Sequence, residues 1–218
     1  TFGVQESDVS RGRASAAHST WWYFREATPG GPNASFGAMT LLTAAEARFS
    51  LPAGFHPAGS ALRITGELPE DVVRFTFDGS TPSESSPAFP DSFPLLRNYV
   101  VRARVYRPGM LPSPVVTRSY LVGNPPSLPV VSIATDGAHL YDADLGILRN
   151  AIKEREVPIS VEYFDSSGTK GFGANAGLRV FGSTIYALPQ RPLAVRLRAD
   201  YGQSELRYPL FRDRANDR

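Results

Sequence analysis

The sequence predicts a mostly β fold, an antiparallel sandwich followed by a second strand-rich segment with minor α content. Short apolar rows alternate with polar residues at period two, which is typical of strands with one buried face. Glycine and proline, 19 residues of each among 218, are spread along the chain and favour turns over long helices. Turn residues separate the rows at regular spacing, and this combination is typical of an antiparallel sandwich.

The middle of the chain contains the clearest of these rows. Its first strand carries the apolar row Val73, Phe75 and Phe77. Asp78 and Gly79 follow directly, and they form a strong turn signal because glycine accepts a positive φ and aspartate bonds its own backbone. Two more strands are predicted, at residues 101–105 and 116–122.

The last third of the chain is again strand-rich. Alternating rows predict strands at residues 159–164, 193–197 and 206–210, and a helical turn or two is expected at 144–153. A linker is predicted at residues 123–127, because consecutive prolines favour an extended chain.

Two segments before the sandwich have less regular patterns. The aromatic run at residues 21–24 predicts a strand, which either ends an upstream domain or is an edge strand in a linker. Residues 36–48 are expected to hold either a short strand at 39–42 or a helical turn at 44–46.

The bulk composition excludes several classes of site. A formal net charge of +2 is too small to indicate nucleic acid binding. The chain has no cysteine, which excludes disulfides, thiolate zinc sites and cysteine nucleophiles. No apolar stretch approaches the roughly 18 residues of a membrane helix, so no membrane insertion is expected. The sequence begins at Thr1 rather than Met, and we therefore expect a piece of a longer protein or a processed form.

The sandwich resembles a known accessory module. The resemblance rests on residues 49–55, 73–82, 100–106 and 109–120. They are similar to the immunoglobulin-like chitobiase/beta-hexosaminidase C-terminal domain, which we place at residues 36–123. The resemblance implies an immunoglobulin-like sandwich that accompanies another domain and carries no chemistry itself.

The two flanking segments also resemble known families. Residues 1–35 are similar to the end of a bacterial lamin-tail-like domain, with a Ser/Gly/Arg stretch, an aromatic strand and a Thr-Pro-Gly exit. Residues 128–218 resemble the N-terminal portion of the CotH (spore-coat protein H) kinase family. The landmarks of that second resemblance are residues 128–133, 135–136, 140–142, 145–147, 155–158, 161–165, 176–182, 189–193, 201–202 and 208–211.

The CotH resemblance implies transfer of phosphate from ATP to protein serine or threonine. Such chemistry needs cations on the phosphates and carboxylates that hold Mg²⁺. The family carries a lysine where this chain has Arg191, followed by Pro192. The glycine-rich run that contains Gly171 and Gly173 is either a phosphate-binding loop or a hairpin connection between strands. The family's catalytic carboxylates lie beyond Arg218, so no catalytic residue is assigned, and ATP and Mg²⁺ are expected only if the kinase interpretation holds.

Three aspartates give a candidate metal site. Asp136, Asp142 and Asp144 cluster around His139 in the sequence, and carboxylate oxygens are ligands of hard cations such as Ca²⁺. The alternative is that they are turn and cap residues around a short helix.

Exposed aromatic side chains give a candidate carbohydrate site. Trp21, Trp22, Tyr99 and Tyr106 are the candidates, because aromatic rings stack on the apolar faces of sugars. Trp21 and Trp22 are adjacent in a predicted strand and point to opposite faces, so one of them is expected to be exposed.

The sequence thus predicts a non-catalytic extracellular or cell-surface fragment of a larger bacterial protein, acting as an accessory, structural or adhesion module. One alternative is the regulatory and nucleotide-binding half of an atypical CotH-type kinase, and another is a carbohydrate-binding module. The expected partners are the remaining domains of the same protein and, beyond them, surface proteins or polysaccharide.

Overall fold

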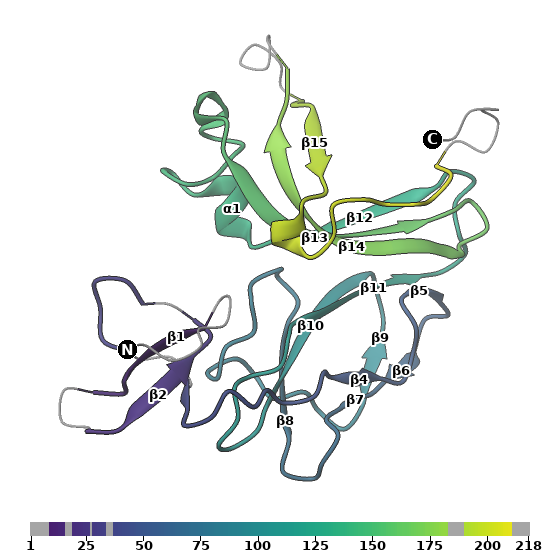
Figure 1. Ribbon diagram of the computed structural model, residues 1–218. Helices are drawn as coiled ribbons and strands as arrows, with labels where there is room; N and C mark the ends of the chain where they lie inside the picture. The colour runs from purple at the N-terminus through teal and green to yellow at the C-terminus, as the bar shows by residue number, and fades with distance from the viewer. Residues whose placement is uncertain (1–8, 16–18, 27, 34–36, 183–189, 211–218) are drawn as a thin grey trace.

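The structure is a computed structural model that describes residues 9–15, 19–26, 28–33, 37–182 and 190–210. Its fold is mostly β, as predicted from the alternating rows. The strands form three groups that follow one another along the chain: an N-terminal sheet, a sandwich and a third sheet (Figure 1).

The N-terminal sheet is small and antiparallel. It contains β1 (Ser10–Arg13), β2 (Trp21–Phe24) and β3 (Gly37–Ala38) in that spatial order. The predicted aromatic strand is therefore the central strand of this sheet. The predictions for residues 36–48 were wrong, because residues 39–42 form no strand and residues 44–46 form no helical turn. Thr43 instead forms an isolated bridge to Leu111.

The sandwich contains eight strands. They are β4 (Arg48–Phe49), β5 (Gly54–His56), β6 (Ser60–Leu62), β7 (Ile64–Thr65), β8 (Val72–Thr76), β9 (Phe93–Leu95), β10 (Tyr99–Tyr106) and β11 (Val116–Val122). The main sheet has the order β5-β11-β10-β8, and the short pairs β4-β7 and β6-β9 complete the module. The pairing of β5 with β11 is parallel, and the other pairs are antiparallel.

The core of the sandwich is filled by the residues that the apolar rows predicted. Its buried members are Ala44, Ala47, Leu62, Ile64, Val73, Leu95, Val101, Ala103, Val105 and Tyr120. Strand β11 has the predicted bounds, and β8 ends at Thr76, one residue before Phe77. The ring of Phe77 still packs in the core, 4.9 Å from the rings of Phe75 and Tyr99.

The third sheet has four antiparallel strands. They are β12 (Val130–Ala134), β13 (Glu156–Phe164), β14 (Lys170–Val180) and β15 (Leu193–Arg196), in that order. The long connection between β12 and β13 contains α1 (Gly137–Tyr141) and the 3-10 turn η1 (Ala151–Lys153). A second 3-10 turn, η2 (Ala199–Tyr201), follows β15. The strands predicted at 159–164 and 193–197 are confirmed. Residues 206–210 form no strand; instead the ring of Tyr208 packs on Tyr163 and Phe172.

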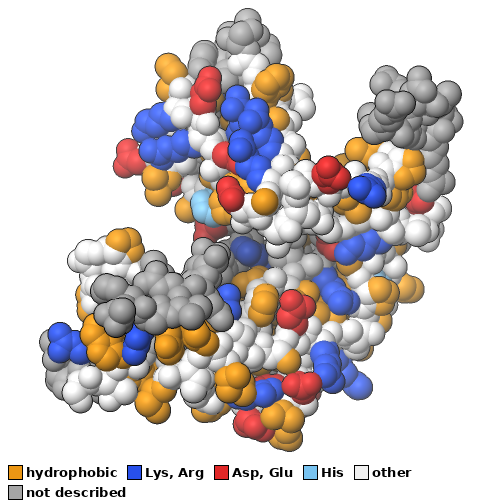
Figure 2. All heavy atoms as spheres, in the orientation of Figure 1, with side chains coloured by type: hydrophobic (Ala, Val, Ile, Leu, Met, Phe, Trp, Pro, Cys, Tyr) orange, Lys and Arg blue, Asp and Glu red, His pale blue; other side chains and the backbone are white. Residues whose placement is uncertain are grey.

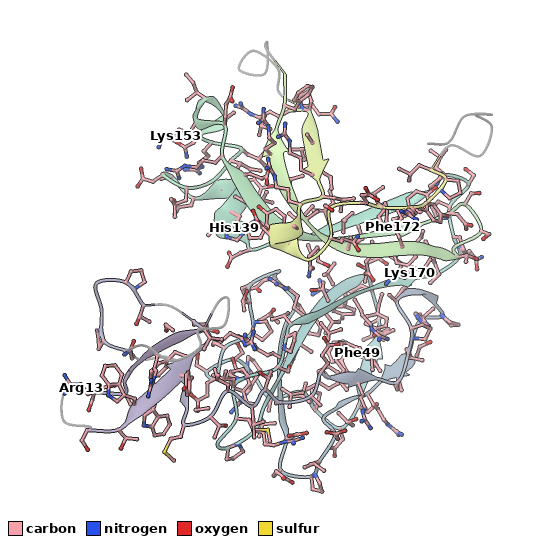
Figure 3. All side chains as sticks on the ribbon, in the orientation of Figure 1. Arg13, Phe49, His139, Lys153, Lys170 and Phe172 are labelled. Carbon is pink, nitrogen blue, oxygen red and sulfur yellow. The ribbon has the colours of Figure 1, made fainter. Side chains whose placement is uncertain are left out.

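The two faces of the third sheet have different neighbours. One face carries the apolar core Ile147, Ala151, Val157, Ile159, Val161, Ala176, Leu178 and Val180, covered in part by the segment of α1 and η1. The other face is turned toward the sandwich (Figure 1). In Figure 3, Phe172 lies on the face of β14 that carries this apolar core, and Lys170 lies on the face toward the sandwich.

Candidate functional site

The surface between the sandwich and the third sheet contains a buried carboxylate. Glu162, on β13, is only 3% exposed. Its Oε2 accepts a hydrogen bond from the backbone N–H of Ser119 on β11 over 2.6 Å, and its Oε1 accepts from Nζ of Lys170 over 2.5 Å. Oγ of Ser119 donates to Oγ of Ser132 on β12 over 2.7 Å. A carboxylate leaves water at low cost only when its oxygens are paired, as they are here.

The position of Glu162 follows from how the strands end. Strand β5 pairs with residues 120–122 of β11 and stops there, so Ser119 lies just beyond the end of the β5 pairing. A buried backbone N–H without a partner costs about 1–3 kcal/mol. Glu162 supplies that partner from the neighbouring unit, and it therefore completes the hydrogen bonding of the sandwich.

The turn after β8 makes a second contact with the third sheet. Gly79 is buried and has φ +83°, and its carbonyl accepts a hydrogen bond from Arg102 over 2.5 Å. A Cβ added at Gly79 would collide with the backbone carbonyl of Thr135, which follows β12. Glycine at position 79 thus serves two purposes. The turn requires its positive φ, and the close approach of Thr135 requires that residue 79 has no side chain.

A third contact lies at the other end of the interface. The rings of Phe55 on β5 and Phe164 on β13 meet edge to face with centroids 6.2 Å apart. Phe164 is fully buried, and its ring also lies next to Gly54 of β5. We call the contacts at Gly79, Glu162 and Phe164 the junction.

A cleft lies within the junction. It has a volume of about 680 Å³ and is lined by Glu46, Pro52, Ala53, Val115, Val116, Thr117, Arg118, Ser160, Glu162, Lys170, Gly173, Ala174, Asn175, Tyr201, Gly202 and Gln203. The two carboxylates in this lining are matched by two cations. A second cavity of about 330 Å³ shares part of the lining and extends toward His139 and Asp200. Ligand pockets of this size are common between domains, and this lining has no excess charge for a polyanion.

The glycine-rich run does not form a loop. Gly171 and Gly173 lie within β14, and Gly173 pairs with Glu162 of β13. Both the phosphate-loop and the hairpin-connection interpretation of this run were therefore wrong, since the connection is the turn at residues 165–169. The run has a strand register because the alternate residues Ala174 and Ala176 continue an apolar row.

A second acid, which is half-buried, lies further along the same face. Glu156 packs across Gly177, where any side chain would collide with it. Its carboxylate pairs with Nε of Arg198 over 2.9 Å and accepts from the hydroxyl of Tyr201 over 3.2 Å. Burial and this carboxylate raise the pKa of the Tyr201 hydroxyl. The cluster holds η2 beside the cleft.

Arg191 is half-buried and lies near the start of the described segment that leads into β15. It is 20 residues from Gly171 in sequence, and Gly171 contacts Tyr208 rather than an open loop. Nucleotide binding by Arg191 stays a prediction.

Two of the three aspartates of the candidate metal site, Asp136 and Asp142, have cap or turn roles. Oδ1 of Asp136 accepts from the backbone N–H of Ala138 and caps α1, and Oδ1 of Asp142 accepts from the N–H groups of Asp144 and Leu145. These hydrogen bonds hold the pKa of Asp142 below its ordinary value. Among the described residues, no group of three or more acidic, histidine or cysteine side chains gathers as a metal site. The cap-and-turn alternative describes what the structure shows.

The four aromatic candidates do not form one site. Trp21 is 52% exposed while its neighbour Trp22 is half-buried, as expected for opposite faces of β2. Tyr106 is buried and its hydroxyl donates to the carbonyl of Pro82, and burial raises its pKa. Tyr99 packs in the aromatic core. The interpretation of Tyr99 and Tyr106 as exposed sugar-binding rings was wrong, because Tyr99 packs against the sandwich core and Tyr106 is buried on the other face of β10.

The N-terminal sheet is also fixed to the sandwich by an ion pair. Arg104 on β10 is 5% exposed, and its guanidinium pairs with Glu26, which follows β2, over 2.7 Å. Nε of the same guanidinium donates to the carbonyl of Ser113 over 2.7 Å. All three groups of strands are therefore connected by polar contacts that are buried or partly buried.

Comparison with known families agrees with the sandwich. A family model described as Fn3 associated matches residues 62–120. The match runs from the end of β6 to β11 and covers an immunoglobulin-like, strand-rich region. Neither the curated proteins nor the solved structures gave a match. No helix in the described ranges is long and apolar enough to cross a membrane.

Sequence reasoning missed Glu162 as a site residue. A signal was present, because a hairpin turning at residues 166–168 brings Glu162 and Lys170 opposite each other. The burial of Glu162 was not predictable, since the surface that covers it belongs to the sandwich, more than 30 residues away in the chain.

Proposed function

We propose that the chain is a non-catalytic accessory module of a larger extracellular or cell-surface bacterial protein, and that it holds the segments on its two sides at a fixed distance and orientation. The junction carries this proposal. A flexible connection between independent domains needs no buried carboxylate, whereas Glu162 is nearly inaccessible and uses both oxygens across and beside the interface.

The family match supports an accessory role. The matched region lies within the sandwich, and the turn at Gly79 inside it packs closely against Thr135. The finer resemblances, to a chitobiase-type module, a lamin-tail end and a CotH-type segment, belong to this proposal. They describe modules that occur together in large secreted bacterial proteins.

The competing function is the nucleotide-binding half of a CotH-type kinase. Its cationic groups would be Arg191 and the arginines of the third sheet. The cleft at the junction favours the accessory role, because Glu46 and Glu162 offset Arg118 and Lys170 and leave no net positive charge for phosphates.

A kinase assay separates the two functions. The whole chain is incubated with ATP and Mg²⁺, alone and with a generic serine/threonine protein substrate, and ATP binding is measured by titration calorimetry. The accessory role predicts no phosphotransfer and no binding heat in either the native chain or Arg191→Ala. Phosphorylation, or binding that Arg191→Ala removes, overturns it.

A further inference from the structure

One face of the β1–β2 hairpin carries two arginines and two aromatic rings. The register pairs Arg11 with Tyr23 and Arg13 with Trp21, and directly opposed residues project from the same face of a sheet. The guanidinium carbon of Arg11 lies 5.7 Å from the centre of the Trp21 ring and 5.6 Å from that of Tyr23. We call these four side chains the hairpin face.

The hairpin face is open to solvent. Arg11, Arg13 and Trp21 are exposed and Tyr23 is half-buried, whereas Phe24, on the other face of β2, is 1% exposed. Figure 2 shows basic and hydrophobic side chains next to each other over β1 and β2, and Figure 3 places Arg13 on the outer side of the hairpin. The sandwich therefore leaves this surface uncovered.

The positive charge of the hairpin face is not neutralised by the residues that the structure describes. Neither Arg11 nor Arg13 forms an ion pair with any of them. Glu26, the acidic side chain that follows β2, is used by Arg104. Two neighbouring cations without counter-charges favour an anionic ligand.

The stacking of Arg11 prepares it for such a ligand. A guanidinium held over aromatic faces keeps its N–H donors in its own plane, where a carboxylate accepts two of them side by side. The exposed ring of Trp21 adds a flat apolar surface at the same place, against which the C–H face of a pyranose ring packs. A ligand that uses both features has a carboxylate on a sugar ring.

We propose that the hairpin face binds an acidic polysaccharide built from uronic acid units. This inference rests on the proposed accessory role, and it names the polymer to which such a module would adhere. The carboxylate pairs with Arg11 and Arg13, and the sugar ring stacks on Trp21. A nucleic acid is disfavoured because two cations and a net charge of +2 give only a weak phosphate interaction.

The test measures binding of the whole chain to soluble polygalacturonate by titration calorimetry at low and at physiological salt. Its fully methyl-esterified form is the matched neutral polymer. The variants are Arg11→Gln, Arg11→Lys and Trp21→Ala, and Arg207→Gln is the control, since Arg207 is exposed and distant in sequence. Circular dichroism checks that each variant is folded.

We expect binding to polygalacturonate that is weakened about tenfold or more by Arg11→Gln and by Trp21→Ala, and unchanged by Arg207→Gln. Arg11→Lys keeps the charge but not the planar stack, so we expect an intermediate loss. Esterified polymer should not bind. The proposal is overturned by absence of binding, by equal affinity in the variants, or by equal affinity for polyglutamate or single-stranded DNA. None of these results changes the outcome of the kinase assay.

Discussion

The backbone N–H of Ser119 donates to the carboxylate of Glu162 over 2.6 Å, and this hydrogen bond helps to join the sandwich to the third sheet. It replaces a strand pairing that ends one residue away, at Tyr120. The acid therefore acts as a substitute strand partner, and the interface is part of the folding of the sandwich rather than a contact between two finished domains.

The first prediction concerns the role of Glu162 as hydrogen-bond acceptor for the backbone N–H of Ser119. Glu162→Gln keeps an acceptor oxygen for Ser119 and should lower the free energy of unfolding by about 1 kcal/mol, whereas Glu162→Leu leaves the buried N–H unpaired and should cost about 3 kcal/mol. Urea unfolding measures both. Lys170 is 37% exposed along its side chain and stays solvated in either variant.

The control for this series is Glu205→Gln, because the side chain of Glu205 is 76% exposed and pairs only with an exposed arginine. It should change the stability by less than about 0.5 kcal/mol. Equal stabilities of Glu162→Gln and Glu162→Leu would show that the acceptor for Ser119 is not needed.

The second prediction separates the turn from the contact at Gly79. Gly79 and Gly109 have nearly the same positive φ, +83° and +79°, but an added Cβ meets the backbone of Thr135 only at Gly79. Gly109→Ala should cost about 1 kcal/mol from backbone strain alone. Gly79→Ala should cost a further 1–3 kcal/mol or so, as overpacking does. Thermal or urea unfolding gives both values, and similar losses would contradict the close approach of the two units.

The third prediction concerns acid stability. The guanidinium of Arg107 donates to both oxygens of Asp71, over 2.6 and 2.9 Å, and holds the pKa of that carboxyl at about 2, below its ordinary value of 3.8. A folded pKa below the unfolded one stabilises the protein above pH 3.8, and this contribution is lost as the pH falls toward 2.

Between pH 5 and pH 2 the native chain should therefore lose about 2 kcal/mol of stability through this one group. Asp71→Asn should be less stable than the native chain at neutral pH, and the two curves should converge near pH 2. Curves that stay parallel over this window would show that Asp71 is not the group responsible.

The strands of the fold were largely predictable from alternating residues. The rows that begin at Val73 and Val101 supply core residues of the sandwich, and the strand predicted at 116–122 is β11. The strand predicted at residues 206–210 was wrong, since the half-buried Tyr208 packs on the face of the third sheet and is not part of a strand. Alternation reports burial, and burial does not require a strand.

The candidate site was predictable only in part. Asp78 and Gly79 were recognised as a turn, but their contact with Thr135 depends on how two distant segments pack. The glycines of β14 were misinterpreted as a loop because glycine is a turn signal in isolation, whereas here Gly173 lies opposite the buried Glu162. When a polar residue is buried by a segment that is distant in the chain, the residues around it in the sequence do not indicate the burial.

The central claim is that the sandwich and the third sheet form one rigid unit held by the junction. Residual dipolar couplings of backbone N–H groups in residues 48–122 and 130–180, in a weakly aligned sample of the whole chain, test it most directly. We predict that one alignment tensor fits both sets of couplings with the relative orientation of Figure 1. Two tensors that differ in magnitude or direction would show that the units move independently, and would contradict the proposed role.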